Sequence, residues 1–196
     1  MARYYNPYFK NASGERGSVW MYTSSIEAVN AILKALDTQK SLGQTELYDK
    51  HHDRYCQLLK KLYEGAEYYK GTFEHISYTQ TKNWTVYAVD RAGAPGAANV
   101  SGVLNVYDDQ QWLTRELIES YHLTGEEEYL EQAEYLTEYI LDGWDCTLDN
   151  FGKEYYIRRE VRNSGYGNFV RDTQRVTLLK KLLDAGYEKQ ILLTCD

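Results

Sequence analysis

The feature that most constrains the fold is a pair of amphipathic helices joined by a very short turn. Apolar residues recur at helical spacing from about Asp108 to Leu123, and again through Leu130 and Ile140 to Gly143. The connection, Leu123-Thr124-Gly125, leaves room only for an antiparallel return. Thr124 and Glu127 have the spacing of a capping box, which satisfies the first amides of a helix. The sequence therefore predicts an antiparallel helical hairpin here.

Two more helices are predicted earlier in the chain. The first begins at Ser24, which has capping-box spacing to Glu27, and the second runs from about Glu46 to Tyr69. Residues 70–106 are predicted to form a long loop with one short strand at 84–89, and loops of this length tend to be functional. Helical hairpins also build α-solenoids, but no second copy recurs at a fixed period. We therefore predict a mainly α fold made of antiparallel helical hairpins.

Composition and charge limit the classes of function. The chain has 196 residues, of which 43% are hydrophobic and 26% charged, as expected of a soluble globular protein. A net charge of -7 without a basic stripe argues against nucleic acid as a partner. Three cysteines and four histidines show no metal-ligand spacing, so we expect no metal site and no disulfide framework. There is no apolar run of membrane length and no signal-peptide core, so export is either absent or its signal has been removed.

Two adjacent carboxylates, Asp108 and Asp109, stand at the start of the third predicted helix among aromatic residues. Cleavage of a glycosidic bond generally needs two carboxyl groups in different protonation states. Repulsion between neighbouring carboxylates raises the pKa of one of them, and Tyr107 and Trp112 offer flat faces to a sugar ring. The alternative is that the pair caps the helix and interacts with its dipole.

Four separate segments carry a resemblance to a known enzyme family. They occur in the family's order and are residues 17–28 (GSVWMYTSSIEA), 78–81 (YTQT), 99–116 and 129–145. Over about residues 15–146 the chain resembles the amino-terminal part of glycoside hydrolase family 76, known for endo-α-1,6-mannanases. The resemblance implies a partial (α/α)6 toroid and a retaining mechanism without a cofactor, with Asp108 as nucleophile and Asp109 as acid/base. It also implies an α-1,6-mannan or related α-mannoside polysaccharide as substrate, and a periplasmic, cell-surface or secreted location.

Aromatic and amide side chains near the carboxylate pair are candidate substrate contacts. We expect this role for Trp20, Asn105, Tyr107 and Trp112. The chain has 20 tyrosines in all, which either stack on sugars or pack between helices with their hydroxyls in water.

The last part of the chain, residues 147–196, has a different texture. A helix over about 172–185 followed by a buried strand at 190–194 predicts a short α/β-like tail. This tail weakly resembles the late part of a phosphotriesterase-type metal hydrolase, with Asp196 at the position of a metal-binding aspartate. The histidine ligands of that family have no matching positions here. We therefore divide the chain into a helical part, 1–146, and a tail, which is either a fused fragment or a diverged end of the same enzyme.

Length restricts what the helical part contains. Twelve toroid helices with their connections need well over 196 residues, so this chain holds roughly the first half. Two functions remain open: a glycoside hydrolase using Asp108 and Asp109, and a non-catalytic helical domain that binds a glycan or a protein. A metal hydrolase ranks third, since only the tail suggests it.

Overall fold

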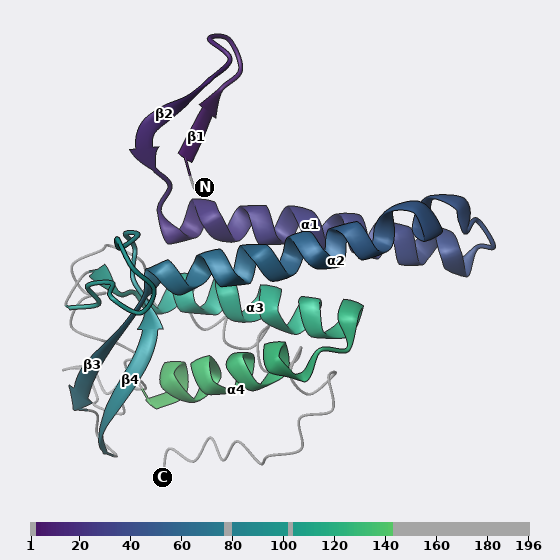
Figure 1. The fold of residues 1–196 in the computed structure, drawn as a ribbon. Helices are drawn as coiled ribbons and strands as arrows, with labels where there is room; N and C mark the ends of the chain where they lie inside the picture. Colours follow the sequence, from purple (N-terminus) through teal and green to yellow (C-terminus); the bar gives the residue numbers. More distant parts are fainter. Residues whose placement is uncertain (1–2, 77–79, 102–103, 143–196) are drawn as a thin grey trace, which may run out of the picture.

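A computed structural model of the chain describes residues 3–76, 80–101 and 104–142 (Figure 1). Its helices are α1 (Val19–Ser41), α2 (Glu46–Ala66), α3 (Tyr107–Thr124) and α4 (Glu127–Asp142), with a 3-10 turn, η1 (Glu67–Tyr69), after α2. Its strands form two antiparallel hairpins, β1 (Arg3–Asn6) with β2 (Asn11–Arg16), and β3 (Lys70–Ile76) with β4 (Thr81–Tyr87). The prediction of a mainly α fold with antiparallel helical hairpins is confirmed.

The two helical hairpins, α1–α2 and α3–α4, lie side by side (Figure 1). Helices α1 and α3 run in the same direction, since Asn30 contacts Glu116 and Lys34, one turn later, forms an ion pair with Glu119. Equivalent helices of successive hairpins are therefore parallel. This is the arrangement of a segment of a helical toroid, in which each hairpin packs against the next.

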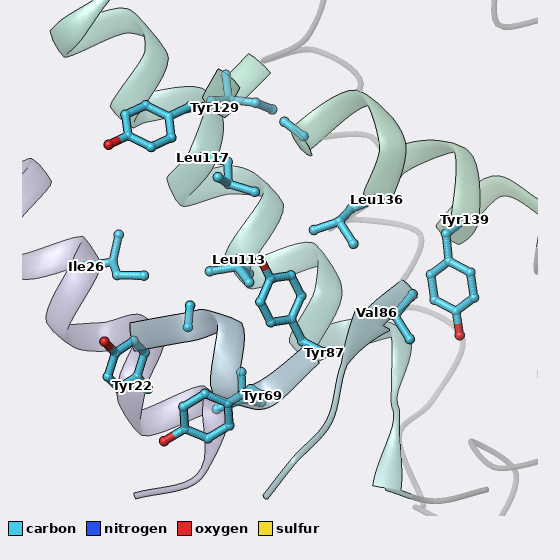
Figure 2. Close-up of a cluster of buried hydrophobic side chains, with 14 of the residues drawn as sticks. Tyr22, Ile26, Tyr69, Val86, Tyr87, Leu113, Leu117, Tyr129, Leu136 and Tyr139 are labelled. Carbon is cyan, nitrogen blue, oxygen red and sulfur yellow. The ribbon is translucent and has the colours of Figure 1, made fainter. Parts of the chain in front are cut away.

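Tyrosine side chains fill much of the core between the hairpins (Figure 2). The buried tyrosines come from α1, η1, β4, α3 and α4 and are Tyr22, Tyr69, Tyr87, Tyr107, Tyr129 and Tyr139. Their rings contact one another, with centroid separations of 5.3 Å for Tyr22–Tyr69 and 5.1 Å for Tyr107–Tyr139. Aliphatic residues such as Ile26, Leu117 and Leu136 complete the packing. These six tyrosines therefore pack mainly between elements of the core.

The first helix begins earlier than its sequence pattern predicted. Helix α1 starts at Val19, and Ser24 lies in its second turn, where the hydroxyl donates to the Met21 carbonyl. The predicted capping box of Ser24 with Glu27 is therefore wrong. The Val19 amide donates instead to the carbonyl of Val89, 2.8 Å away, so a distant segment satisfies this end of the helix.

The second predicted capping box is also wrong. Thr124 is the last residue of α3, and its hydroxyl donates to the Ser120 carbonyl. Gly125 follows with φ 72° and donates its amide to Tyr121, which closes the helix in the left-handed conformation that glycine tolerates. The turn is as short as predicted, but a glycine C-cap makes it.

Three strands were missed and one was found. The predicted strand at 84–89 corresponds to the later part of β4, whereas β3 lies in a stretch predicted to be loop. The inward positions of β3 are Gly71, Phe73 and His75, which do not form an apolar alternation. Hairpin β1–β2 has no buried residue at all and so gives no periodic signal.

The division at residue 146 and the α/β-like tail, including Asp196, lie outside the described residues. No helix in the described part is long and apolar enough to cross a membrane.

Candidate functional site

The two candidate catalytic carboxylates lie in the first turn of α3. The N-cap position belongs to Val106, which is extended (φ -120°, ψ 146°), and no side chain caps the helix. Asp108 and Asp109 are therefore the second and third helical residues. Neither aspartate is therefore the N-cap of α3, although both carboxylates lie at the positive end of the helix dipole.

The carboxyl group of Asp109 has a raised pKa. Burial and, to a smaller degree, the neighbouring charge of Asp108 together raise this pKa from 3.8 to about 7. A helix N-terminus alone lowers the pKa of a carboxyl group, because its dipole favours the anion. Burial and repulsion outweigh the dipole here. The sequence indicated the repulsion correctly, but burial, the larger cause, depends on tertiary packing.

A buried glutamine fixes the first turn of α3 to the sheet. Gln110 is fully buried; its Oε1 accepts from the Tyr87 amide at 3.0 Å and its Nε2 donates to the Tyr87 carbonyl at 2.6 Å. The same Nε2 lies 3.2 Å from Oδ1 of Asn105. These bonds tie the residue next to the aspartate pair to strand β4. Sequence reasoning missed Gln110; its only signal is a polar residue at a helix position that the pattern makes inward.

Asn105 and Tyr107, two predicted substrate contacts, lie inside the core. Asn105 is fully buried and donates from Nδ2 to the Tyr139 hydroxyl at 2.8 Å. Tyr107 is 1% exposed, and its ring packs on that of Tyr139. Both therefore support the segment that leads into the aspartates.

Trp20 and Trp112 are the accessible members of the predicted contact set. Trp20 is 58% exposed in the first turn of α1. That turn is joined to the approach to α3 through Val89, whose carbonyl accepts from Val19 and whose amide donates to Leu104. The starts of α1 and α3 therefore share one end of the bundle (Figure 1). Trp112, half-buried, follows Asp108 by one helical turn.

Two polar residues on the Asp108 face of α3 were not predicted. Gln111 and Arg115 follow Asp108 by three and seven residues, so they share its side of the helix. Gln111 is fully buried, yet neither its amide nitrogen nor its oxygen has a hydrogen-bond partner. The Arg115 guanidinium stacks over Trp112, 4.7 Å from the ring centroid, with its Nε also unpaired. Helical spacing from Asp108 was the one available signal for both.

The described residues contain no group of three or more histidine, cysteine, aspartate or glutamate side chains that could hold a metal ion. The raised pKa of Asp109, next to a second carboxyl group, is the chemical feature on which the candidate site rests.

Comparisons with known proteins give a distant structural likeness. No family model matches the chain, and no curated protein matches it. Among solved structures, the chain is similar to a selenomethionine derivative of a GH76 α-mannanase from Bacteroides thetaiotaomicron, at 15% identity and a TM-score of 0.46. The match covers 87% of this chain and 44% of the mannanase, so the chain spans less than half the length of that structure. The phosphotriesterase-type resemblance of the tail has no support in these comparisons.

Proposed function

We propose that this chain is the amino-terminal part of a retaining glycoside hydrolase that acts on α-1,6-mannan or a related α-mannoside polysaccharide. The observation that carries the proposal is the raised pKa of Asp109, about 7, in a carboxyl group adjacent to Asp108. A glycosidase needs one carboxyl group that holds a proton near neutral pH and another that attacks as the anion. The substrate class rests on the sequence resemblance alone.

In the proposed mechanism the two aspartates act in turn. Asp108 attacks the anomeric carbon while Asp109 gives its proton to the leaving glycosidic oxygen, which produces a glycosyl ester on Asp108 and a shortened glycan. Asp109, now ionised, takes a proton from water, and the resulting attack on the anomeric carbon releases the sugar with its configuration retained. Asp109 ends protonated, as it began.

Other residues have supporting roles in this proposal. Trp20 and Trp112 provide aromatic faces for sugar rings at the same end of the bundle. The half-buried Arg115 supplies guanidinium donors on the Asp108 face that suit sugar hydroxyls, whereas Gln111 on the same face is fully buried. Asn105 and Tyr107, being buried, hold the first turn of α3 in place. Their part is to position the aspartates, and they contact sugar only if the core opens.

A second candidate function is a non-catalytic domain that binds a glycan or a protein. Exposed aromatic side chains favour it, since Tyr8 is 84% exposed, Phe9 69% and Trp20 58%. Exposed aromatic side chains that form a contiguous patch are typical of interaction sites. In this case the aspartates stabilise α3 through its dipole and do no chemistry.

The deciding experiment measures reducing ends released from linear α-1,6-mannan by the purified chain. Asp108→Asn should abolish release, and Asp49→Asn is the matched control, because Asp49 is also an aspartate in the first turn of a helix. Circular dichroism checks that all proteins are folded. Release that survives Asp108→Asn rules out the proposed nucleophile. A folded parent chain that migrates more slowly in a gel containing mannan, but releases no reducing ends, supports the second candidate.

Azide rescue tests the role of Asp109 separately. An aryl α-mannoside with an acidic phenol needs little help in leaving, and azide needs no general base to attack. Azide should therefore restore turnover to Asp109→Asn, with an α-mannosyl azide as product, and should not restore Asp108→Asn. Equal behaviour of the two variants contradicts the assignment of roles.

A further inference from the structure

Hairpin β1–β2 carries the most exposed aromatic cluster in the described structure. Tyr5 is 62% exposed, Tyr8 84% and Phe9 69%, and the rings of Tyr8 and Phe9 meet edge to face at 5.1 Å. The hairpin projects away from the helices, with these residues toward its tip (Figure 1). An apolar cluster that the chain itself leaves uncovered is typical of an interaction surface.

The tip has a defined conformation that presents these rings. Oδ1 of Asn6 accepts hydrogen bonds from the amides of Tyr8 and Phe9 at 3.0 and 3.1 Å. The Asn6 side chain thus closes the turn. Lys10 takes the left-handed conformation with φ 51° and returns the chain into β2. The aromatic residues are therefore held at the tip by the turn.

The hairpin is positively charged in a chain that is acidic overall. Arg3, Lys10 and Arg16 are exposed, against a single acid, Glu15. None of the three cations forms an ion pair with a residue that the structure describes. Since the whole chain carries -7, a negatively charged surface is available on every other copy of the same protein.

A groove with complementary properties lies between α2 and the turn that joins α3 to α4. Its volume is about 500 Å³, and Tyr63 and Tyr129, with ring centroids 4.6 Å apart, contribute to its wall. Glu64, Glu126 and Glu128 also line it, and none of these three carboxylates is in an ion pair within the described residues. The groove thus combines aromatic surface with negative charge, partly offset by Lys60.

Cys56, also in the groove wall, reports the same negative environment. Burial raises the pKa of its thiol, and the charges of Asp53, Asp37 and Glu126 raise it further.

We propose that the tip of the β1–β2 hairpin of one copy docks into this groove of a second copy of the chain. Tyr8 and Phe9 pack against Tyr63 and Tyr129, while Lys10 approaches the glutamates. The contact is heterologous, because the two surfaces differ, so it generates head-to-tail chains or a closed ring. This association is independent of the proposed hydrolase activity.

The hairpin of one copy does not fill the groove of the same copy. Only Gly17 and Ser18 separate β2 from α1, and the Gly17 carbonyl accepts a hydrogen bond from the buried Tyr69 hydroxyl at 2.7 Å. This short, anchored connection keeps the hairpin directed away from the bundle (Figure 1). A second molecule is therefore the occupant that the geometry favours.

Sedimentation velocity on the full chain tests the proposal. The parent should associate in a concentration-dependent way, and added salt should weaken the association, because charge complementarity contributes to it. A hairpin variant, Tyr8→Ser with Phe9→Ser and Lys10→Glu, and a groove variant, Glu126→Lys with Glu128→Lys, should each raise the dissociation constant at least about tenfold. Glu27→Lys with Glu131→Lys, two exposed carboxylates outside the groove lining, is the matched charge control and should associate like the parent.

Mixing the two defective variants gives the sharpest result. The groove variant keeps an intact hairpin and the hairpin variant keeps an intact groove, so an equimolar mixture should form a one-to-one dimer that grows no further. A parent chain that stays monomeric to about 100 µM overturns the proposal, whether the groove is empty or filled by the chain itself. So does a mixture of folded variants that remains monomeric while the parent associates, since the contact is then not between these two surfaces.

Discussion

Asp109 occupies an environment that opposes its charge, and this has a consequence for stability as well as for chemistry. Its folded-state pKa is raised from 3.8 to about 7, first by burial and then by Asp108. Between these two pH values the folded protein holds a proton that the unfolded chain has lost, so stability falls as the pH rises. Above about pH 7 the full penalty remains. Each pKa unit corresponds to about 1.4 kcal/mol, which after screening gives a penalty of about 2–4 kcal/mol.

Asp109→Asn should therefore stabilise the chain by about 2–4 kcal/mol at pH 8 and by much less at pH 4, where the carboxyl is protonated in the folded state. Urea denaturation at the two pH values measures the difference. Asp49→Asn, the matched residue on α2, should show no gain of this kind. A gain that is equal at both pH values contradicts the raised pKa and removes the main support for the acid/base role.

The adjacent residues Gln110 and Gln111 form an internal comparison. Both are fully buried, but Gln110 satisfies the amide and the carbonyl of Tyr87, whereas the Gln111 side chain has no hydrogen-bond partner. Gln110→Leu should destabilise the fold by about 2–4 kcal/mol, because it leaves buried backbone groups unpaired. Gln111→Leu should be neutral or stabilising, because it replaces a buried, unpaired amide with an apolar side chain. Thermal melts of the two variants measure their stabilities. A large loss of stability in Gln111→Leu would mean that the Gln111 side chain does have a hydrogen-bond partner.

At the scale of elements, helices were predicted more accurately than strands. The predicted third helix, Asp108 to Leu123, is found at Tyr107–Thr124, because its apolar period is long and its ending glycine is unambiguous. The start of α1 was misplaced because the Val89 carbonyl, from a remote segment, caps it. Strand β3 was missed because only one of its three inward residues, Phe73, is large and apolar. The other two are Gly71 and His75.

The candidate site divides in the same way. The aspartate pair and its position at a helix start follow from local sequence. The burial of Asn105 and Tyr107, and the hydrogen bonds of Gln110, depend on β4 and α4, which lie far away in sequence. Local pattern therefore found the carboxylates but did not separate accessible neighbours from buried ones.

A close contact between α1 and α2 gives a prediction at this scale. A β-carbon added at Gly65 would overlap the Tyr22 hydroxyl, which donates to the Leu62 carbonyl at 2.7 Å. Alanine is normally better than glycine in a helix by about 0.5–1 kcal/mol. Gly65→Ala should nevertheless destabilise the hairpin, by about 1–3 kcal/mol, because Tyr22 is packed against Tyr69 and has little freedom to move.

Removing the hydroxyl should relieve part of this strain. Denaturant titrations of Gly65→Ala, Tyr22→Phe and the double variant form a cycle, and the double variant should be more stable than the sum of the two single effects. Simple additivity would mean that the helices separate to admit the methyl group. Gly43→Ala is not a suitable control because Gly43 has a positive φ of 82°, so a solvent-facing helical substitution such as Ser25→Ala serves instead.

At the scale of the whole molecule, the two helical hairpins are joined by a buried polar cluster as well as by apolar packing. Asn30 of α1 donates from Nδ2 to the Glu116 carbonyl and to its Oε2, at 3.1 and 3.0 Å. The Ser120 hydroxyl lies 3.0 Å from Asn30 Oδ1 and 2.8 Å from the hydroxyl of Tyr63 on α2. One cluster therefore links α1, α2 and α3, and it holds α3, which carries the aspartates, against the first hairpin.

Loss of this cluster should weaken cooperation between the hairpins. Asn30→Ala removes a donor from a buried carboxylate and should cost about 2–4 kcal/mol. Asn30→Asp places a second carboxylate beside Glu116, so its cost should be larger at pH 8 than at pH 5.

In the parent, unfolding followed by circular dichroism and by tryptophan fluorescence should have the same midpoint, as a two-state transition requires. In Asn30→Ala the two midpoints should separate, because α3, which carries Trp112, detaches from α1 before all helices melt. Asn83→Ala, on the exposed side of β4, should leave them together. Coincident midpoints in Asn30→Ala would mean that apolar packing of Ile26, Leu113 and their neighbours is enough to make the two hairpins unfold as one unit.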